Sequence, residues 1–209
     1  MKKLFTTLFA VLGIYTLAHA QQSKGLEFGV GVGYNGASVS NSSNQTTNSK
    51  SGFNVAVSAD NYFSDRWSLK VKAIYDQKGW GNGFLAYAQG NSLTVYQQVD
   101  YALNYITVPV MANWHFGKTR KWYLNFGPYA GFLLDAKATS GYTGSVKGLF
   151  NTVDGGLAYG IGVKLPIAEK TKFYIEFDGQ NGVANLFKNI ASANTIHSVR
   201  GSFNIGINF

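Results

Sequence analysis

The chain has 209 residues, of which 13% are charged, 15% are aromatic and 25 are glycine, and its formal net charge is +8. The absence of cysteine excludes a disulfide scaffold and a thiolate metal site, the many aromatic residues exclude a disordered chain, and a mean hydropathy of −0.06 excludes a bundle of membrane helices. The remaining combination indicates a β-structure whose two faces differ.

The first segment, residues 1–20, has the features of a secretory signal peptide. Lys2 and Lys3 form a basic start, residues 4–17 are mainly apolar, and Ala18-His19-Ala20 supplies the small-x-small pattern that a signal peptidase needs. The alternative, a transmembrane anchor, requires about 20 apolar residues, and this stretch is shorter. We therefore expect cleavage before Gln21.

Residues 21–209 read as a single domain of eight segments with a period of two, the pattern of β-strands. The segments are 26–34, 53–62, 67–76, 101–116, 122–136, 153–165, 173–178 and 198–209. This pattern predicts an all-β fold, an eight-stranded antiparallel up-and-down transmembrane β-barrel. Alternation alone also fits a soluble periplasmic ligand-binding barrel, which stays open as the architectural alternative.

The charges avoid the apolar face of every segment and gather on the opposite face. Those on the opposite face are Glu27, Asp60, Lys70, Lys72, Asp76, Asp135, Asp154, Lys164, Glu176, Asp178 and Arg200. In a membrane barrel the uncharged face meets lipid and the charged face lines the lumen. Four apolar residues fall on the lumen side and depart from this pattern, namely Leu103, Met111, Tyr129 and Leu133.

Three further features favour the membrane. Long polar connections alternate with short ones, as in bacterial outer-membrane barrels; the long ones are 35–51, 78–99, 137–152 and 180–194, and the short ones are 64–66, 117–121 and 166–171. Aromatic residues such as Trp67, Trp114 and Trp122 lie near strand ends, where they form interfacial girdles. The last strand ends on Phe209, which we interpret as the membrane-assembly signal read by the outer-membrane insertion machinery.

Several motifs resemble the PorT-like outer-membrane β-barrel family. They are Tyr105-Ile106-Thr107-Val108-Pro109-Val110, Gly127-Pro128-Tyr129-Ala130-Gly131, Asp154-Gly155-Gly156 with Gly160-Ile161-Gly162, and Gly182-Val183-Ala184-Asn185-Leu186. The resemblance covers the chain after the signal peptide and implies an eight-stranded barrel in a Gram-negative outer membrane. It implies no catalytic residue, and a few members of that family are linked to protein secretion.

An eight-stranded barrel is just wide enough for its inward side chains to fill it, so we expect no open pore. The lumen residues predicted to form an internal ion-pair network are Glu27, Lys70, Lys72, Asp76, Asp135, Asp154, Lys164, Glu176, Asp178 and Arg200. Lys164 and Glu176 flank one short turn and are expected to face each other. A narrow proton or ion path is the functional alternative for the same charges.

No catalytic, cofactor or metal site is expected. Gly31, Gly33 and Gly36 fit the dinucleotide spacing, but they lie in a strand that leads into a polar loop, with no helix to present amides to a pyrophosphate. We therefore interpret them as glycines that leave room inside the barrel and at its bend. His197 and Ser198 are the hydrolase candidates, but adjacent strand residues point to opposite faces. His115, near a turn, is expected at the interface.

The basic residues outside the lumen indicate partners at the two ends. Those in the long loops are expected to meet lipopolysaccharide phosphates, namely Lys50, Lys78, Lys137, Lys147 and Lys188. Scattered basic residues do not indicate nucleic-acid binding, and loops 40–51 and 79–98 are the expected surface for an unknown protein partner. The lumen itself is expected to be acidic.

These observations favour a small integral outer-membrane protein, bathed in outer-membrane lipid and lipopolysaccharide, with a structural, surface-recognition or assembly role and no catalytic activity. The alternative is transport of a small or hydrophobic compound through the lumen or wall of the barrel. A lipid hydrolase is the third hypothesis.

Overall fold

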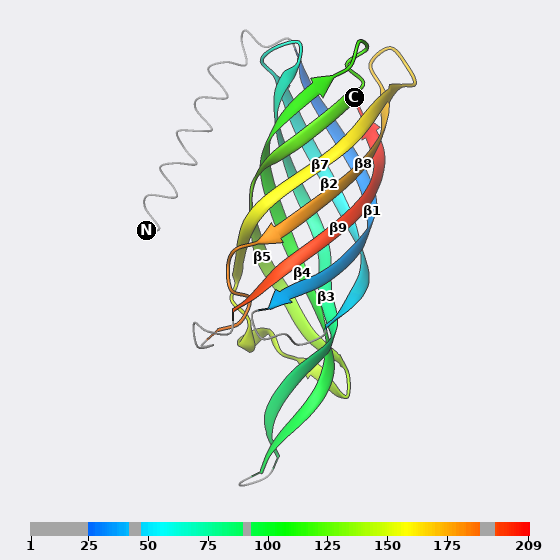
Figure 1. Ribbon diagram of the computed structural model, residues 1–209. Coiled ribbons are helices and arrows are strands. Elements are labelled where there is room, and N and C mark those ends of the chain that lie inside the picture. Colours follow the sequence, from blue (N-terminus) through cyan, green and yellow to red (C-terminus); the bar gives the residue numbers. More distant parts are fainter. Residues whose placement is uncertain (1–24, 42–46, 90–92, 189–194) are drawn as a thin grey trace.

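The computed structural model describes residues 25–41, 47–89, 93–188 and 195–209, and these are almost entirely β-strand (Figure 1). The predicted signal peptide lies outside the described residues. The strands are β1 (Leu26–Asn41), β2 (Asn48–Tyr62), β3 (Trp67–Gln89), β4 (Leu93–Phe116), β5 (Trp122–Ser140), β6 (Tyr142–Ser145), β7 (Val153–Pro166), β8 (Lys172–Gly182) and β9 (Ile196–Asn208), with one 3-10 turn, η1 (Lys147–Leu149). Among the described residues, no helix is long and apolar enough to cross a membrane.

Eight of the strands close into an antiparallel barrel. The hydrogen-bonded order is β4-β3-β2-β1-β9-β8-β7-β5-β6, and pairing of β4 with β5 completes the ring. The four-residue β6 folds back on the end of β5 and takes no part in the closure. The eight-stranded antiparallel barrel predicted from the alternation is confirmed.

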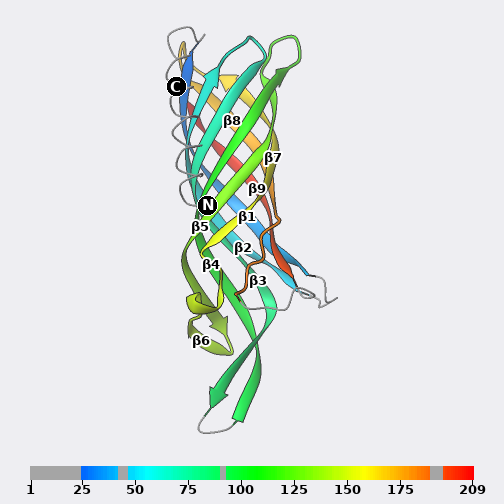
Figure 2. The same ribbon diagram turned by 90° about the vertical axis from the view of Figure 1, so that its left-hand side faces the viewer.

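The two ends of the barrel differ. The short turns after β2, β4 and β7 lie at the same end as the C-terminus, at the top of Figure 1, and we call this the turn end. At the opposite end the β3–β4 hairpin projects well beyond the other strands (Figures 1 and 2). We call this the hairpin end.

Large apolar side chains face outward around the whole barrel, and polar ones face inward. On β1, for example, every second residue from Leu26 to Tyr34 is about half exposed, whereas Glu27 and Asn35 are buried. Outward residues of the other strands follow the same rule, among them Phe53, Val57, Phe126, Leu157, Ile161, Phe177, Phe203 and Ile205. A continuous exposed apolar band is the inverse of a water-soluble barrel, so the soluble alternative is wrong.

The hairpin end is more ordered than the sequence pattern predicts. Residues 78–99, expected to be a polar loop, continue β3 and β4 as paired strands up to Gln89↔Leu93. The pairing shifts register between Trp80 and Gly83, next to Gly79 at a left-handed φ of 152°. Beyond this irregularity Leu85 and Val99 are buried, so a second apolar face stabilises the extension.

Candidate functional site

The lumen is packed with polar side chains that water cannot reach. Its inward charged residues between the two ends, from Glu27 and Asp60 near the turn end to Asp154 near the hairpin end, are at most 8% exposed, except Asp178, whose side chain is 10% exposed. An open channel would leave the side chains along its walls exposed to water, so the described part of the lumen is closed. Three ionic clusters, stacked along the barrel axis, fill it.

The central cluster is built around Glu176 of β8, which is fully buried. Its carboxylate accepts hydrogen bonds from Lys70 at 3.0 Å and from Lys72, both on β3 across the lumen. Tyr123 on β5 donates through its hydroxyl at 2.8 Å, and Asn125 donates at 3.0 Å. Four donors from β3 and β5 therefore meet at one carboxylate on β8, which satisfies the buried charge.

The second cluster lies toward the hairpin end and is centred on Arg200 of β9. Its guanidinium lies 2.7 Å from Asp178 and 3.4 Å from Asp76, and it donates to the Asn35 side chain at 3.0 Å. Lys78 extends the cluster, with its ammonium 3.4 Å from Asp154 and 3.9 Å from Asp76. These contacts link β1, β3, β7, β8 and β9 across the lumen.

The third cluster lies near the turn end and is centred on Lys164 of β7. Its ammonium donates to Glu27, to Asp60 at 2.9 Å and to the Tyr62 hydroxyl at 2.9 Å. Lys172, at the barrel rim, donates to the other oxygen of Glu27. Each inward carboxylate of the three clusters thus has a cationic partner, and the lumen is nearly balanced in charge rather than acidic as the sequence suggested.

Four expectations about charged or polar residues are wrong. Lys164 and Glu176 do not face each other, because the register pairs Lys164 with Tyr174 and Glu176 with Gly162. Asp135 is not in the lumen network: the β4–β5 register shifts beside Leu134, and Asp135 instead lies 3.2 Å from the exposed Lys137. That register shift changes which side chains of β5 point inward.

The other two wrong expectations concern the positions of Lys78 and His115. The sequence pattern places Lys78 in an external loop, yet the residue is buried because β3 continues through it. The sequence predicts an interfacial position for His115, yet the residue is 3% exposed and lies within the lumen, with Nε2 3.2 Å from the Asn113 amide nitrogen. Continued strand alternation through Lys78 could have indicated its inward position.

An apolar cap closes the lumen at the hairpin end. Trp80 and Tyr101 pack with ring centroids 4.8 Å apart, and Phe150 meets Phe187 at 4.5 Å and Tyr101 at 5.4 Å. The segments that carry the two phenylalanines are tied together, since the Asn151 amide donates to the carbonyls of Asn185 and Phe187. We call Trp80, Tyr101, Phe150, Leu186 and Phe187 the cap.

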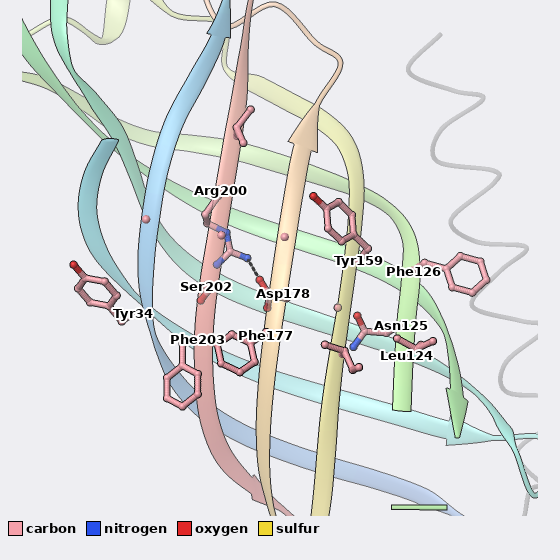
Figure 3. A pocket seen from close by; sticks show the side chains of 16 residues that line it. Tyr34, Leu124, Asn125, Phe126, Tyr159, Phe177, Asp178, Arg200, Ser202 and Phe203 are labelled. Atoms are coloured by element: carbon pink, nitrogen blue, oxygen red, sulfur yellow. Dashed lines mark hydrogen bonds and ion pairs between the residues drawn. The ribbon is translucent and has the colours of Figure 1, made fainter. Parts of the chain in front are cut away.

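A hollow of about 880 Å³ lies on the barrel wall and spans β1, β9, β8, β7 and β5. Its floor contains three outward glycines in one register row, since Gly36 pairs with Gly201 and Gly201 with Gly179. A second, aromatic row lies two residues closer to the turn end on the same three strands. It consists of Tyr34, Phe203 and Phe177. Figure 3 shows this wall groove with the Arg200–Asp178 ion pair between β9 and β8.

The glycines that fit the dinucleotide spacing and the hydrolase candidates His197 and Ser198 have structural positions in the barrel. A Cβ on Gly31 would lie 1.9 Å from the Tyr174 hydroxyl, and one on Gly33 would lie 1.9 Å from the Asn204 amide oxygen. These two glycines therefore make room for lumen side chains. Ser198 points inward, whereas the His197 ring lies 3.0 Å from the Ala184 carbonyl oxygen, and the pair does not form a nucleophile and its base.

Among the described residues, neither a second Ser–His pair nor a metal site supports catalysis. The Ser68 hydroxyl lies 3.5 Å from His115 Nε2, but both residues are buried in the lumen, where a lipid ester has no access. No group of His, Asp and Glu side chains in the described ranges could hold a metal ion.

The closed barrel, its apolar outer band and its polar lumen define a class: small integral outer-membrane β-barrel proteins. The sequence matches the family model described as "Outer membrane protein beta-barrel domain" over residues 19–188. The chain belongs to this family. Its short turns therefore face the periplasm, and the hairpin end faces the cell exterior.

Solved structures share the architecture. The outer membrane protein OprG from Pseudomonas aeruginosa is 14% identical, with a TM-score of 0.56, and the match covers 89% of this chain and 95% of that one. Neisserial surface protein A (NspA) is 16% identical, with a TM-score of 0.51 and coverage of 89% and 97%. At these identities the similarity concerns the fold. No curated protein matches the sequence.

Proposed function

We propose that the chain is a closed, non-catalytic membrane anchor that presents the β3–β4 hairpin as a recognition element at the cell surface. The observation that carries this proposal is the filled lumen: three ionic clusters and the cap leave the charged side chains between its two ends with little or no access to water. A barrel without an open lumen acts through its outer surfaces, and the hairpin is the element that extends furthest from the membrane (Figure 1).

The hairpin has the properties of a preformed binding surface. It is braced on the barrel, because Leu85 and Val99 pack with the cap and the Tyr101 hydroxyl donates to the Phe84 carbonyl at 2.8 Å. Its other face carries Phe84 and Tyr96, which are 55% and 76% exposed on paired strands. Rigid, exposed aromatic side chains are typical anchors of protein interfaces.

The chemistry of the hairpin indicates its kind of partner. Residues 79–99 contain no Asp, Glu, Lys or Arg, so attraction between charges contributes little to binding. Recognition would use aromatic packing together with the backbone edges of the extension that pair with no further strand in the described ranges, and such edges can accept an added strand. A protein partner with an uncharged surface fits this chemistry better than lipopolysaccharide phosphates do.

The test replaces both exposed aromatics. A photo-cross-linking residue at position 98, beside Phe84 in the β3–β4 register, should capture a surface or secreted protein in living cells. The Phe84→Ser/Tyr96→Ser variant should lower the yield about tenfold or more, because truncated anchors cost about 2 kcal/mol each and 1.4 kcal/mol is tenfold. The cross-linking protein should keep the heat-modifiable gel migration of a folded barrel both with and without the Phe84→Ser/Tyr96→Ser substitutions.

The matched control is Leu149→Ser/Val183→Ser, which removes two exposed apolar side chains from the same end of the barrel but outside the hairpin. It should leave the cross-linking yield unchanged. An unchanged yield for the Phe84→Ser/Tyr96→Ser variant, or no captured protein at all, would contradict the recognition role.

Finer assignments follow from the sequence. We propose that the chain belongs to a PorT-like branch of the family, supported by the motif from Tyr105 to Val110, and that lipopolysaccharide surrounds its outer end.

We also propose that Phe209 is read by the insertion machinery. Its backbone exchanges hydrogen bonds with Phe28 at 2.8 and 2.9 Å, so the residue joins the last strand to the first.

Transport of a hydrophobic compound remains the alternative function, and the wall groove is the observation that favours it. Such a compound would enter from the lipid side rather than through the filled lumen. Under this alternative, proteoliposomes take up a fluorescent long-chain fatty acid. Gly201→Leu, at a position where an added Cβ would meet no atom within 4 Å, places an apolar side chain in the groove and abolishes the uptake. Ile205→Leu on the same strand is the control. Uptake by wild type equal to that of empty liposomes would contradict transport.

A further inference from the structure

Basic residues gather on two neighbouring turns at the periplasmic end. The turn between β2 and β3 carries Arg66, and the turn between β4 and β5 carries Lys118, Arg120 and Lys121, all exposed. The third short turn, between β7 and β8, carries Glu169 and Lys170 and adds no net charge. Among the three described turns, the net positive charge therefore lies on the two neighbouring ones.

The two basic turns form one surface. The His115 amide donates to the Arg66 carbonyl at 2.7 Å, and the Arg120 guanidinium lies 3.2 Å from Asp65. A hollow of about 510 Å³ opens between them, lined by residues 63–67 and Arg120. We call Arg66, Lys118, Arg120 and Lys121 the basic rim. Asp65 is the one acidic residue on these two turns, so the rim has a net positive charge.

Arg120 is unusual in its backbone. It has a left-handed φ of 53°, one of two such non-glycine residues in the described ranges. Glycine or asparagine adopts this conformation with less strain, so backbone geometry does not favour a guanidinium at this position. An outlier of this kind is consistent with a role for the side chain.

An aromatic girdle fixes the depth of the basic rim. Trp67 pairs with Trp114 at 6.3 Å between ring centroids, and Trp114 stacks on Phe116 at 5.3 Å. Trp122 pairs with Phe116 in the β4–β5 register and is 49% exposed. Exposed tryptophans at a strand end mark the boundary between lipid and water. The basic residues come directly before or after these strand ends, and therefore lie at the depth of the lipid headgroups.

We propose that the basic rim binds the phosphate headgroup of an anionic phospholipid in the periplasmic leaflet of the outer membrane. The cations supply the charge, the girdle supplies apolar contact for the glycerol and upper acyl chains, and the hollow beside Trp67 supplies space. Basic residues next to a membrane surface select anionic over zwitterionic lipids in this way. This inference is independent of the recognition role of the hairpin.

The test uses tryptophan quenching in the folded full barrel. The protein is reconstituted in phosphatidylcholine vesicles that contain either brominated phosphatidylglycerol or brominated phosphatidylcholine. The girdle tryptophans report lipid contact, because the fourth tryptophan, Trp80, is buried in the cap. We expect about a tenfold preference for phosphatidylglycerol at low salt, from the attraction of several juxtamembrane cations, and a weaker preference at high salt.

Neutralising the rim should remove this preference. The variant Arg66→Gln/Lys118→Gln/Arg120→Gln/Lys121→Gln should be quenched equally by the two brominated lipids, whereas Lys170→Gln/Lys188→Gln should behave as wild type. Heat-modifiable migration verifies that each variant is folded. A wild type without lipid preference, or a rim variant that keeps it, would overturn the proposal. Rim-dependent binding to isolated peptidoglycan without lipid preference would also overturn it, and would assign the rim to the cell wall.

Discussion

Replacing Glu176 by glutamine is expected to lower the free energy of unfolding by about 3–5 kcal/mol, the usual cost of breaking a buried ion pair from one side. Glutamine keeps the shape of the side chain but removes the charge that compensates Lys70 and Lys72. Both lysines are at most 5% exposed and belong to β3, on the far side of the lumen. The amide also cannot accept all four hydrogen bonds that the carboxylate receives.

The loss is measured by urea unfolding of the barrel folded into lipid vesicles, followed by tryptophan fluorescence. Glu169→Gln is the control, because Glu169 lies exposed in the β7–β8 turn and surface substitutions of this kind stay within about 0.5 kcal/mol. Adding Lys72→Met to Glu176→Gln should recover part of the loss, since one uncompensated charge is removed. A Glu176→Gln variant as stable as the control would show that the central cluster does not stabilise the barrel.

The architecture could be predicted from the sequence because it depends on a local signal. Lipid outside and polar groups inside impose a period of two on every strand, and the charged residues reveal which face points inward. Even the apolar exceptions Leu103, Met111, Tyr129 and Leu133 are buried as their position in the alternation requires. Apolar residues inside the lumen do not disturb the pattern, because they pack there against aromatic and methylene groups.

The ion-pair partners could not be predicted in the same way. Partners such as Lys72 and Glu176 come from β3 and β8, which are not hydrogen-bonded neighbours. Their meeting depends on strand tilt and on the stagger that closes the barrel, and neither is written in the local pattern. Lys164 and Glu176 lie on paired strands, yet the register places them two residues apart, and each finds its partners across the lumen.

The hairpin end was the least predictable region. Register shifts reverse the faces of a strand, which is why Asp135 leaves the lumen network. The cap joins Trp80, Phe150 and Phe187 from segments that looked like three separate polar loops. Isolated aromatic residues within such loops were the available signal, because large buried rings need partners that only another loop can provide.

The cap leads to the second large expected effect. Phe150 is fully buried and contacts Trp80, Tyr101 and Phe187, so Phe150→Ala is expected to cost about 3–5 kcal/mol of unfolding free energy. The adjacent Leu149 is 41% exposed, and Leu149→Ala is the matched control, expected to cost far less. Urea unfolding in lipid vesicles measures both.

Removing two aromatic rings of the cap tests whether the cap alone closes the barrel to ions or only braces the hairpin. The double variant Phe150→Ala/Phe187→Ala should be less stable than wild type, yet in planar bilayers both proteins should show no ion conductance. The reason is the arrangement beneath the cap: Arg200 remains paired with Asp178, and Lys72 with Glu176, so the ionic clusters still fill the lumen. Steady conductance steps from the double variant would mean that the cap alone closes the barrel, and would favour transport over recognition. Silence from both proteins would assign the cap to bracing the hairpin, which is the role that its packing against Leu85 and Val99 supports.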